Sequence, residues 1–247
     1  TEVTAFSVIT DYSTKVKYPL ADFEITPDIA VLDGTIAQTM PKTLTAHTGM
    51  DAMTHAIEAY VASARSDFSD PLALKAISMI YENLVDSYNG DKEARGKMHI
   101  AQCLAGMAFS NALLGIVHSL AHKVGAQYEV PHGCCNAIML PFVIQFNSKV
   151  CMNRFADIAR TMGLPGATDK QLTNSLVAAI RELNRKVGIA ASYKEHGVPE
   201  ELFKSTLDFV CENAVKDPCT GANPRACTVE DLKKVLTCSY YGEDVTF

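Results

Sequence analysis

Residues 113–141 read LLGIVHSLAHKVGAQYEVPHGCCNAIMLP and place three histidines, His118, His122 and His132, among mostly apolar neighbours. The whole chain has only seven histidines in 247 residues, so composition alone does not account for this grouping. An imidazole without a partner is costly in apolar surroundings, and a divalent metal ion is one partner that satisfies it. The segment therefore predicts a buried helical core that carries a polar site.

The spacing within this segment indicates how the histidines are arranged. His118 and His122 are four residues apart, which on a helix places both side chains on one face. Gly125 is expected to end that helix. The Pro-His-Gly sequence that follows predicts that His132 lies on a loop with a constrained backbone.

A second segment, residues 47–61, reads HTGMDAMTHAIEAYV and repeats the four-residue spacing in Asp51 and His55, with Glu58 continuing the same stripe. An isolated Asp-x-x-x-His pair is more often a surface hydrogen bond than a pair of metal ligands. Two helices and one loop can, however, bring four or five metal-binding groups to one point. The two segments together therefore favour a divalent metal site.

Helical patterns dominate the rest of the chain, and they are clearest in residues 69–90, 169–188 and 228–242. Ser69 or Asp70 is expected to cap the first of these helices, and Gly90 to end it. Gly188 is expected to end the second, and Thr228 to cap the third.

The first 34 residues have a different pattern. EVTAFSVIT and KVKYPL flank the turn sequence DYST, and DIAVLD at residues 28–33 reads as a short buried strand. Such an arm is too small to form a stable sheet alone. We therefore predict a mainly α fold, in which a strand-rich arm over residues 1–34 precedes an all-helical metal-binding domain over residues 35–247.

Composition excludes several classes of function. The formal net charge is −6 with both signs scattered, so no basic stripe indicates binding to nucleic acid or to a membrane surface. The sequence shows no secretion signal, and the eight cysteines are expected to be mostly buried thiols in the cytoplasm. Sequence motifs of zinc proteases, α/β-hydrolases, P-loops and Gly-x-Gly-x-x-Gly dinucleotide sites are absent.

Three stretches carry a resemblance to a known family: GMDAMTHAIEAYVA, AGMAFSNALLGIVHSLAHKVGAQYEVPHGCCNAIMLP and DPCTGANPR. In order and spacing the chain resembles the iron-dependent (group III) alcohol dehydrogenases. It is most similar in appearance to the alcohol dehydrogenase half of bifunctional aldehyde-alcohol dehydrogenases, although stand-alone butanol-type enzymes share much of the pattern. The resemblance implies interconversion of a small primary alcohol and its aldehyde by hydride transfer with NAD(H) or NADP(H).

The resemblance also implies roles for individual residues. Asp51, His55, His118 and His132 correspond to the ligands of one Fe²⁺ ion, with Zn²⁺ as the alternative metal. His122 corresponds to a histidine that does not bind the metal, lies beside the nicotinamide and takes part in proton transfer.

Further correspondences concern the cofactor and the substrate. Val8, Lys17 and Phe109 fall where the family contacts or walls the cofactor, and Phe109 and Cys219 fall at the substrate pocket. A cytoplasmic enzyme of fermentation, forming a homodimer or larger homo-oligomer, is implied as well. The family's N-terminal α/β nucleotide-binding domain, with its Gly-Gly-Gly-Ser turn, is not in this sequence, so residues 1–34 are expected to be its remnant.

Two alternatives remain open from the sequence. The helical domain could be a non-catalytic assembly or docking module when it is separated from a nucleotide-binding domain. A metal-dependent hydrolase or lyase could use the same ligands, and it would need a general base, for which Glu58 is the obvious candidate.

Overall fold

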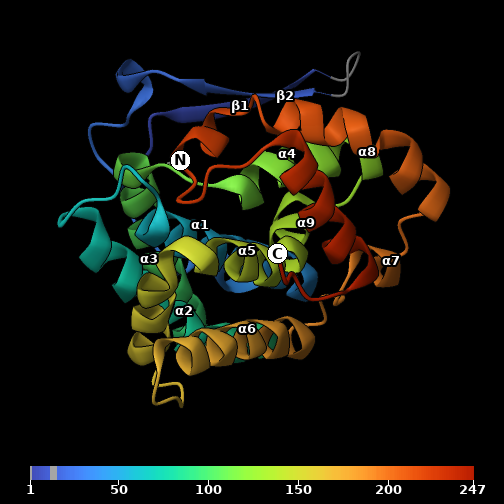
Figure 1. Ribbon diagram of the computed structural model, residues 1–247. Coiled ribbons are helices and arrows are strands. Elements are labelled where there is room, and N and C mark those ends of the chain that lie inside the picture. The colour runs from blue at the N-terminus through green and yellow to red at the C-terminus, as the bar shows by residue number, and fades with distance from the viewer. Residues whose placement is uncertain (1, 12–15) are drawn as a thin grey trace.

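The computed structural model describes residues 2–11 and 16–247, and it shows a helical body with a two-stranded hairpin along one side (Figure 1). The predicted mainly α fold is therefore confirmed. The elements in chain order are β1 (Phe6–Asp11), β2 (Val16–Ala21), η1 (Phe23–Ile25), η2 (Ile36–Thr39), α1 (Lys42–Val61), α2 (Ser69–Asn89), α3 (Lys92–Ala112), α4 (Ile116–Tyr128), α5 (His132–Thr161), α6 (Asp169–Lys186), α7 (Tyr193–His196), α8 (Glu200–Ala214), η3 (Pro218–Ala222) and α9 (Val229–Tyr241).

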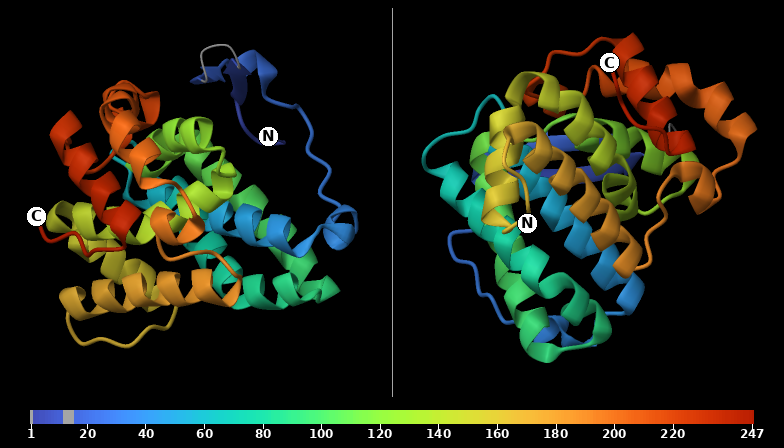
Figure 2. Two further views of the ribbon diagram at one scale, coloured as in Figure 1. Left: turned by 90° about the vertical axis from the view of Figure 1, so that its right-hand side faces the viewer. Right: turned by 60° about the horizontal axis from the view of Figure 1, so that its bottom comes forward.

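Strands β1 and β2 pair in antiparallel fashion, with Phe6 opposite Ala21. The chain then runs along the outside of the helical body before it enters α1 (Figure 2). The strand predicted for residues 28–33 is wrong: this segment is irregular, and Ile29 and Val31 are 81% and 84% exposed. Within the described residues no strand lies beside it, and an extended segment without a ladder partner has little to stabilise it. A boundary near residue 34 stays a prediction.

Arg95 fastens the end of this outer segment to the body. Its side chain is buried, and its guanidinium donates to the backbone carbonyls of Ala37, Gln38, Met40 and Ser87. Several hydrogen bonds satisfy a buried charge that would otherwise be costly. The chain is therefore fixed from residue 37 onward.

Helix α1 lies at the centre of the body, where it packs against α2, α3 and α5, while α6 packs on α5 and α4 packs between α5 and α8 (Figures 1 and 2). In the part of the chain that the structure describes, no single helix is long and apolar enough to cross a membrane. Helices α3 and α4 meet those criteria only as a pair, and they meet at a bend of 108°.

Most of the predicted helix ends are confirmed. Gly90 follows α2 with φ 99°, and Gly188 follows α6 with φ 76°. Thr228 caps α9 by accepting a hydrogen bond from the backbone N–H of Asp231. The cap predicted for α2 is wrong, because Ser69 already lies in the first turn of that helix.

The predicted break at Gly125 and the loop around His132 are also wrong. Helix α4 continues through Gly125 to Tyr128, and His132 is the first residue of α5. A Cβ atom at Gly125 would lie 3.1 Å from the carbonyl oxygen of Val130, so this glycine allows close packing and does not end the helix. The backbone carbonyl of Pro131 accepts a hydrogen bond from the N–H of Cys135 and thereby opens α5. His132 consequently stands on a helix.

Close packing of α5 on α1 predicts an effect on stability. A methyl group at Gly133 would collide with the backbone carbonyl of His47, so we expect Gly133→Ala to lower the free energy of unfolding by about 1–3 kcal/mol. Gly96→Ala in α3 is the matched control, because nothing lies within 4 Å of its added methyl group. Urea unfolding of both variants measures the difference, and equal midpoints would contradict the close approach.

Candidate metal centre and its cavity

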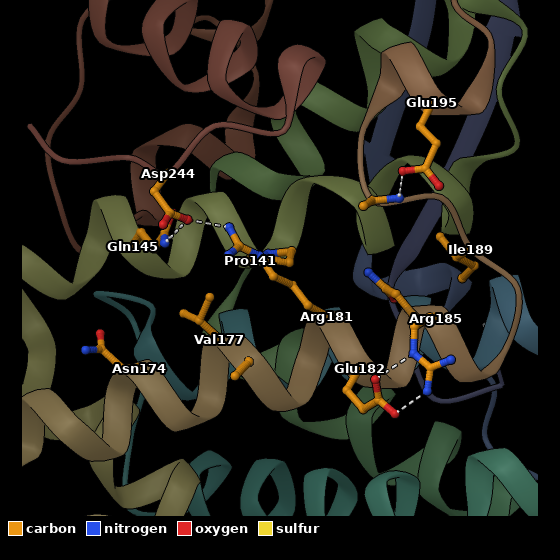
Figure 3. A pocket seen from close by; sticks show the side chains of 13 residues that line it. Pro141, Gln145, Asn174, Val177, Arg181, Glu182, Arg185, Ile189, Glu195 and Asp244 are labelled. Atoms are coloured by element: carbon orange, nitrogen blue, oxygen red, sulfur yellow. Dashed lines mark hydrogen bonds and ion pairs between the residues drawn. The ribbon is translucent and has the colours of Figure 1, made fainter.

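One cavity, of about 690 Å³, lies between α5, α6 and the C-terminal residues (Figure 3). None of the predicted site residues lines it. Its arginines pair with neighbouring acids: Arg181 lies 2.7 Å from Asp244, and Arg185 lies 2.7 Å from Glu182. Charged groups that already satisfy one another leave little for a ligand, so this cavity is not the candidate site.

A second cavity, of about 500 Å³, opens between the hairpin, α1, α3, α4 and η3. Every predicted site residue whose side chain the structure describes lines it: Asp51, His55, Phe109, His118, His122, His132 and Cys219. Val8 and Lys17 belong to the paired strands, but their side chains lie outside the described part of the chain. Residues from distant parts of the sequence are thus brought to one cavity.

Three of the predicted ligands converge at the base of this cavity. Asp51 on α1, His118 on α4 and His132 on α5 each place one potential ligand atom within 4.8 Å of the other two. The Nε2 atoms of His118 and His132 each lie 3.6 Å from Oδ1 of Asp51. Three helices therefore supply one carboxylate and two imidazoles to a single point.

Asn136 also faces this point, and the sequence reading missed it. Its amide nitrogen lies 2.5 Å from Asp51 Oδ1, 3.1 Å from His118 Nε2 and 3.2 Å from His132 Nε2. All three acceptor atoms are therefore aimed at one common partner. Asn136 is four residues after His132 on α5, so the helical spacing could have revealed it.

His55 lies beside the three converging groups without joining them. Its ring stacks on His118 and on Phe109, with 4.5 Å between centroids in both pairs. Its Nδ1 is buried and 4.0 Å from Asp51 Oδ2, and it has no hydrogen-bond partner among the described residues. His55 stays a predicted fourth ligand.

Glu58 holds His118 from behind. One carboxylate oxygen accepts the backbone N–H of Val117 at 2.7 Å, and the other accepts Nδ1–H of His118 at 2.6 Å. Gly115 allows this approach, because a Cβ there would lie 2.8 Å from Glu58 Oε1. A proton fixed on Nδ1 leaves Nε2 directed at the convergence point, the usual arrangement of a metal-binding histidine with a carboxylate behind it.

Three of the four predicted ligands are in protonation states that suit a cation. Burial lowers the pKa of His55 to about 4 and that of His132 to about 3, so both rings are neutral at pH 7 with a lone pair to offer. Burial also acts on Asp51, but the surrounding imidazoles outweigh it and hold the pKa of Asp51 well below its usual range. Burial lowers the pKa of His118, yet hydrogen bonds to Asp51 and Glu58 raise it to about 9 overall, so a metal ion must displace a proton from its Nε2. A divalent ion is a fitting partner for this donor set.

His122 is held by a different carboxylate. Its Nδ1 donates to Asp217 Oδ2 at 3.1 Å, and Lys123 Nζ donates to the same oxygen at 3.0 Å. The His122 ring also stacks on His132, with centroids 5.4 Å apart. Asp217 is nearly fully buried and lies 95 residues from His122 in the sequence, so the sequence reading did not identify it.

Comparison with known families agrees with this geometry. Residues 45–240 match the family described as Fe-containing alcohol dehydrogenase family, C-terminal. The chain belongs to the Fe-containing alcohol dehydrogenase family.

Two relatives and a solved structure show how far the similarity extends. The chain is 60% identical over its whole length to the NADPH-dependent butanol dehydrogenase of Clostridium saccharobutylicum, covering 64% of that protein. It is 42% identical over 98% of its length to the bifunctional aldehyde-alcohol dehydrogenase of Escherichia coli K12, covering 30% of it. The iron-containing alcohol dehydrogenase of Thermococcus thioreducens superposes with a TM-score of 0.89 and 36% identity, over 98% of this chain and 62% of that one. The chain thus spans less than two thirds of each of these proteins.

In this member of the Fe-containing alcohol dehydrogenase family, weakening the hydrogen bond from His118 to Glu58 is predicted to lower the affinity for the metal. Glu58→Gln can no longer hold a proton on Nδ1 as strongly, so we expect metal affinity to fall 10- to 100-fold, as is typical for such supporting carboxylates. Glu182→Gln on α6 is the control and should bind metal normally, because Glu182 does not line the 500 Å³ cavity. Anaerobic titration with Fe²⁺ against a competing chelator measures both. Unchanged affinity in Glu58→Gln would show that Glu58 only fills space.

Proposed function

We propose that this chain is the metal-binding part of an alcohol dehydrogenase that interconverts a small primary alcohol and its aldehyde by hydride transfer with NAD(P)(H). The observation that carries the proposal is the convergence of Asp51, His118 and His132 at a cavity walled by apolar side chains. Family membership supports the reaction class. The butanol dehydrogenase name of the 60% identical relative supports a short alcohol, and its NADPH dependence supports NADP(H).

In this proposal Asp51, His118 and His132 hold the metal, with His55 as the fourth ligand. A bound divalent ion supplies Lewis acidity that favours loss of the alcohol proton and polarises an aldehyde. The family description supports iron, although a site of nitrogen and oxygen ligands generally binds Zn²⁺ more tightly than Fe²⁺. The metal therefore depends on supply as well as on the ligands.

The side chains of the cavity have separate tasks in the proposed reaction. Asp217 fixes the proton of His122 on Nδ1, so the other ring nitrogen is left to exchange a proton with the substrate hydroxyl. Phe109 stacks on His55 and walls the cavity, and Cys219 lines the same cavity from η3. These apolar walls would exclude water from the path of the hydride.

The remaining parts of the proposal follow the resemblance. They are a cytoplasmic location, a role in fermentation, a homodimer or larger homo-oligomer, and cofactor contacts from Val8, Lys17, Phe109 and His122. Residues 1–34 would be the remnant of a nucleotide-binding domain.

The hydrolase alternative loses its candidate base, because both oxygens of Glu58 already accept hydrogen bonds.

The test is made on the whole natural protein that contains this chain. After anaerobic loading with Fe²⁺ or Zn²⁺, we expect C2–C6 primary alcohols to drive reduction of NAD⁺ or NADP⁺, followed by absorbance. A protein that binds the metal but oxidises none of these alcohols, and reduces none of the aldehydes, would favour the docking-module alternative.

The 247-residue chain alone is expected to bind NAD(P)H weakly or not at all. Nucleotide pyrophosphates are usually held by a Gly-rich turn at a helix N-terminus, and this sequence has no such motif. Calorimetry of NADPH with the metal-loaded chain measures the affinity, and NADP⁺ with the whole protein is the positive control. Micromolar binding to the chain alone would contradict the expectation.

A further inference from the structure

A second group of metal-binding side chains lies next to the candidate metal centre. His122 on α4 and Asp217 and Cys219 at η3 each offer one ligand atom, and these atoms all lie within 4.8 Å of one another. Asp217 and His122 are buried, whereas Cys219 is partly exposed. Both His122 and Cys219 line the 500 Å³ cavity, so an ion can reach the group from the same opening.

The local structure holds these side chains in place. Asp217 caps η3 by accepting the backbone N–H of Cys219 through Oδ1 at 3.1 Å. Thr220 then fastens η3 to its surroundings, because its hydroxyl lies 2.7 Å from Ser119 Oγ on α4 and 2.6 Å from the carbonyl of Ala214. The donor groups are therefore presented by two elements that are bonded together.

The chemistry of the donors differs from that of the first centre. A thiolate, an imidazole and a carboxylate suit Zn²⁺ and other thiophilic divalent ions, whereas the first centre offers only nitrogen and oxygen. We infer that His122, Asp217 and Cys219 form a second site, selective for Zn²⁺, beside the centre of Asp51, His118 and His132.

Bound protons and one ammonium group compete with an ion at this site. The Cys219 thiol loses its proton to solvent as the Sγ–Zn bond forms, the proton on His122 Nδ1 moves through solvent to the other ring nitrogen, and no oxidation or reduction takes place. The ammonium of Lys123, 3.0 Å from Asp217 Oδ2, must withdraw from that oxygen. The Lys123 side chain is 11% exposed, and its ammonium stands on a flexible aliphatic chain, so the ammonium can turn toward solvent. Lys123 is consequently expected to lower the affinity of this second site for an ion.

A consequence for activity rests on the proposed function. An ion on His122 Nδ1 would replace the proton that Asp217 now holds there, so the other ring nitrogen would carry the proton and could no longer accept one from the substrate hydroxyl. Excess Zn²⁺ would then inhibit an enzyme whose first centre is already filled. Binding at the second site does not depend on that consequence, so it can be tested without any assay of turnover.

The test uses Cd²⁺ as the probe on the folded 247-residue chain, because a cadmium–thiolate bond gives an ultraviolet charge-transfer band and the first centre contains no thiol. We expect one such band per chain, displaced by Zn²⁺. Cys219→Ser should abolish it, whereas the matched control Cys227→Ser should keep it. His132→Ala should also keep it. Circular dichroism establishes that each variant is folded.

Lys123→Met provides an independent measurement, since it removes the competing ammonium and keeps the length of the side chain. We expect it to tighten Cd²⁺ binding about tenfold. A band that persists in Cys219→Ser, disappears in His132→Ala or resists Zn²⁺ would overturn the assignment. An unchanged affinity in Lys123→Met would do so too. Failure of the proposed dehydrogenase reaction would leave all four results unaffected.

Discussion

His132→Ala is expected to abolish stoichiometric metal binding at the candidate centre. His132 supplies one of the three candidate ligand atoms that converge there among the described residues, and it stands at the start of α5. Removing it leaves one carboxylate and one imidazole, supplemented at most by His55, which is too few for tight binding. Elemental analysis after loading with Fe²⁺ and gel filtration measures the metal content.

His47→Ala is the matched control, because His47 lies on the same helix as Asp51 but does not line the cavity. It should retain the metal content of the unaltered chain. Equal metal in the His132 and His47 variants would refute the predicted ligand set. Fe²⁺ is used for loading because the thiol-containing second site favours Zn²⁺.

His122→Gln in the whole protein should lower kcat by about 10²- to 10⁴-fold, the usual contribution of a positioned acid-base group, while metal content stays stoichiometric. Glutamine can still donate a hydrogen bond to Asp217, so the fold around η3 should persist. His196→Gln, on short α7, is the control and should keep normal turnover. Loss of Fe²⁺ from the centre of Asp51, His118 and His132 in His122→Gln would make His122 a ligand of that centre, and full turnover would remove its proposed role.

Local signals in the sequence predicted local structure well. Gly90 and Thr228 act over one turn of helix, and the structure has them where the pattern indicated. The helix end predicted at Gly125 was wrong because this glycine allows the close approach of the Val130 carbonyl and does not end the helix. The strand predicted for residues 28–33 was wrong because β-forming side chains need a neighbouring strand, and the pattern of one segment does not reveal whether there is one.

The convergence of the candidate ligands could be predicted only in part from helical spacing. That spacing grouped Asp51 with His55 and His118 with His122, whereas His132 was expected on a loop and lies at the start of α5. Glu58 and Asp217 were not assigned their partners, since those hydrogen bonds join residues 60 and 95 positions apart. Contacts of this kind depend on how helices pack, which periodicity within one helix does not specify.

The hydrogen bonds that Arg95 donates to the carbonyls of Ala37, Gln38 and Met40 also determine where proteases can cleave the chain. Proteolysis requires several consecutive residues of backbone that can leave the fold, and exposed irregular segments supply them. Residues 26–33 are exposed and irregular, whereas the carbonyls of Ala37, Gln38 and Met40 accept hydrogen bonds from Arg95. Limited digestion would therefore separate the hairpin from the helices at this segment. The larger fragment would keep Asp51, His118 and His132, so the metal centre would survive as part of a smaller, purely helical protein.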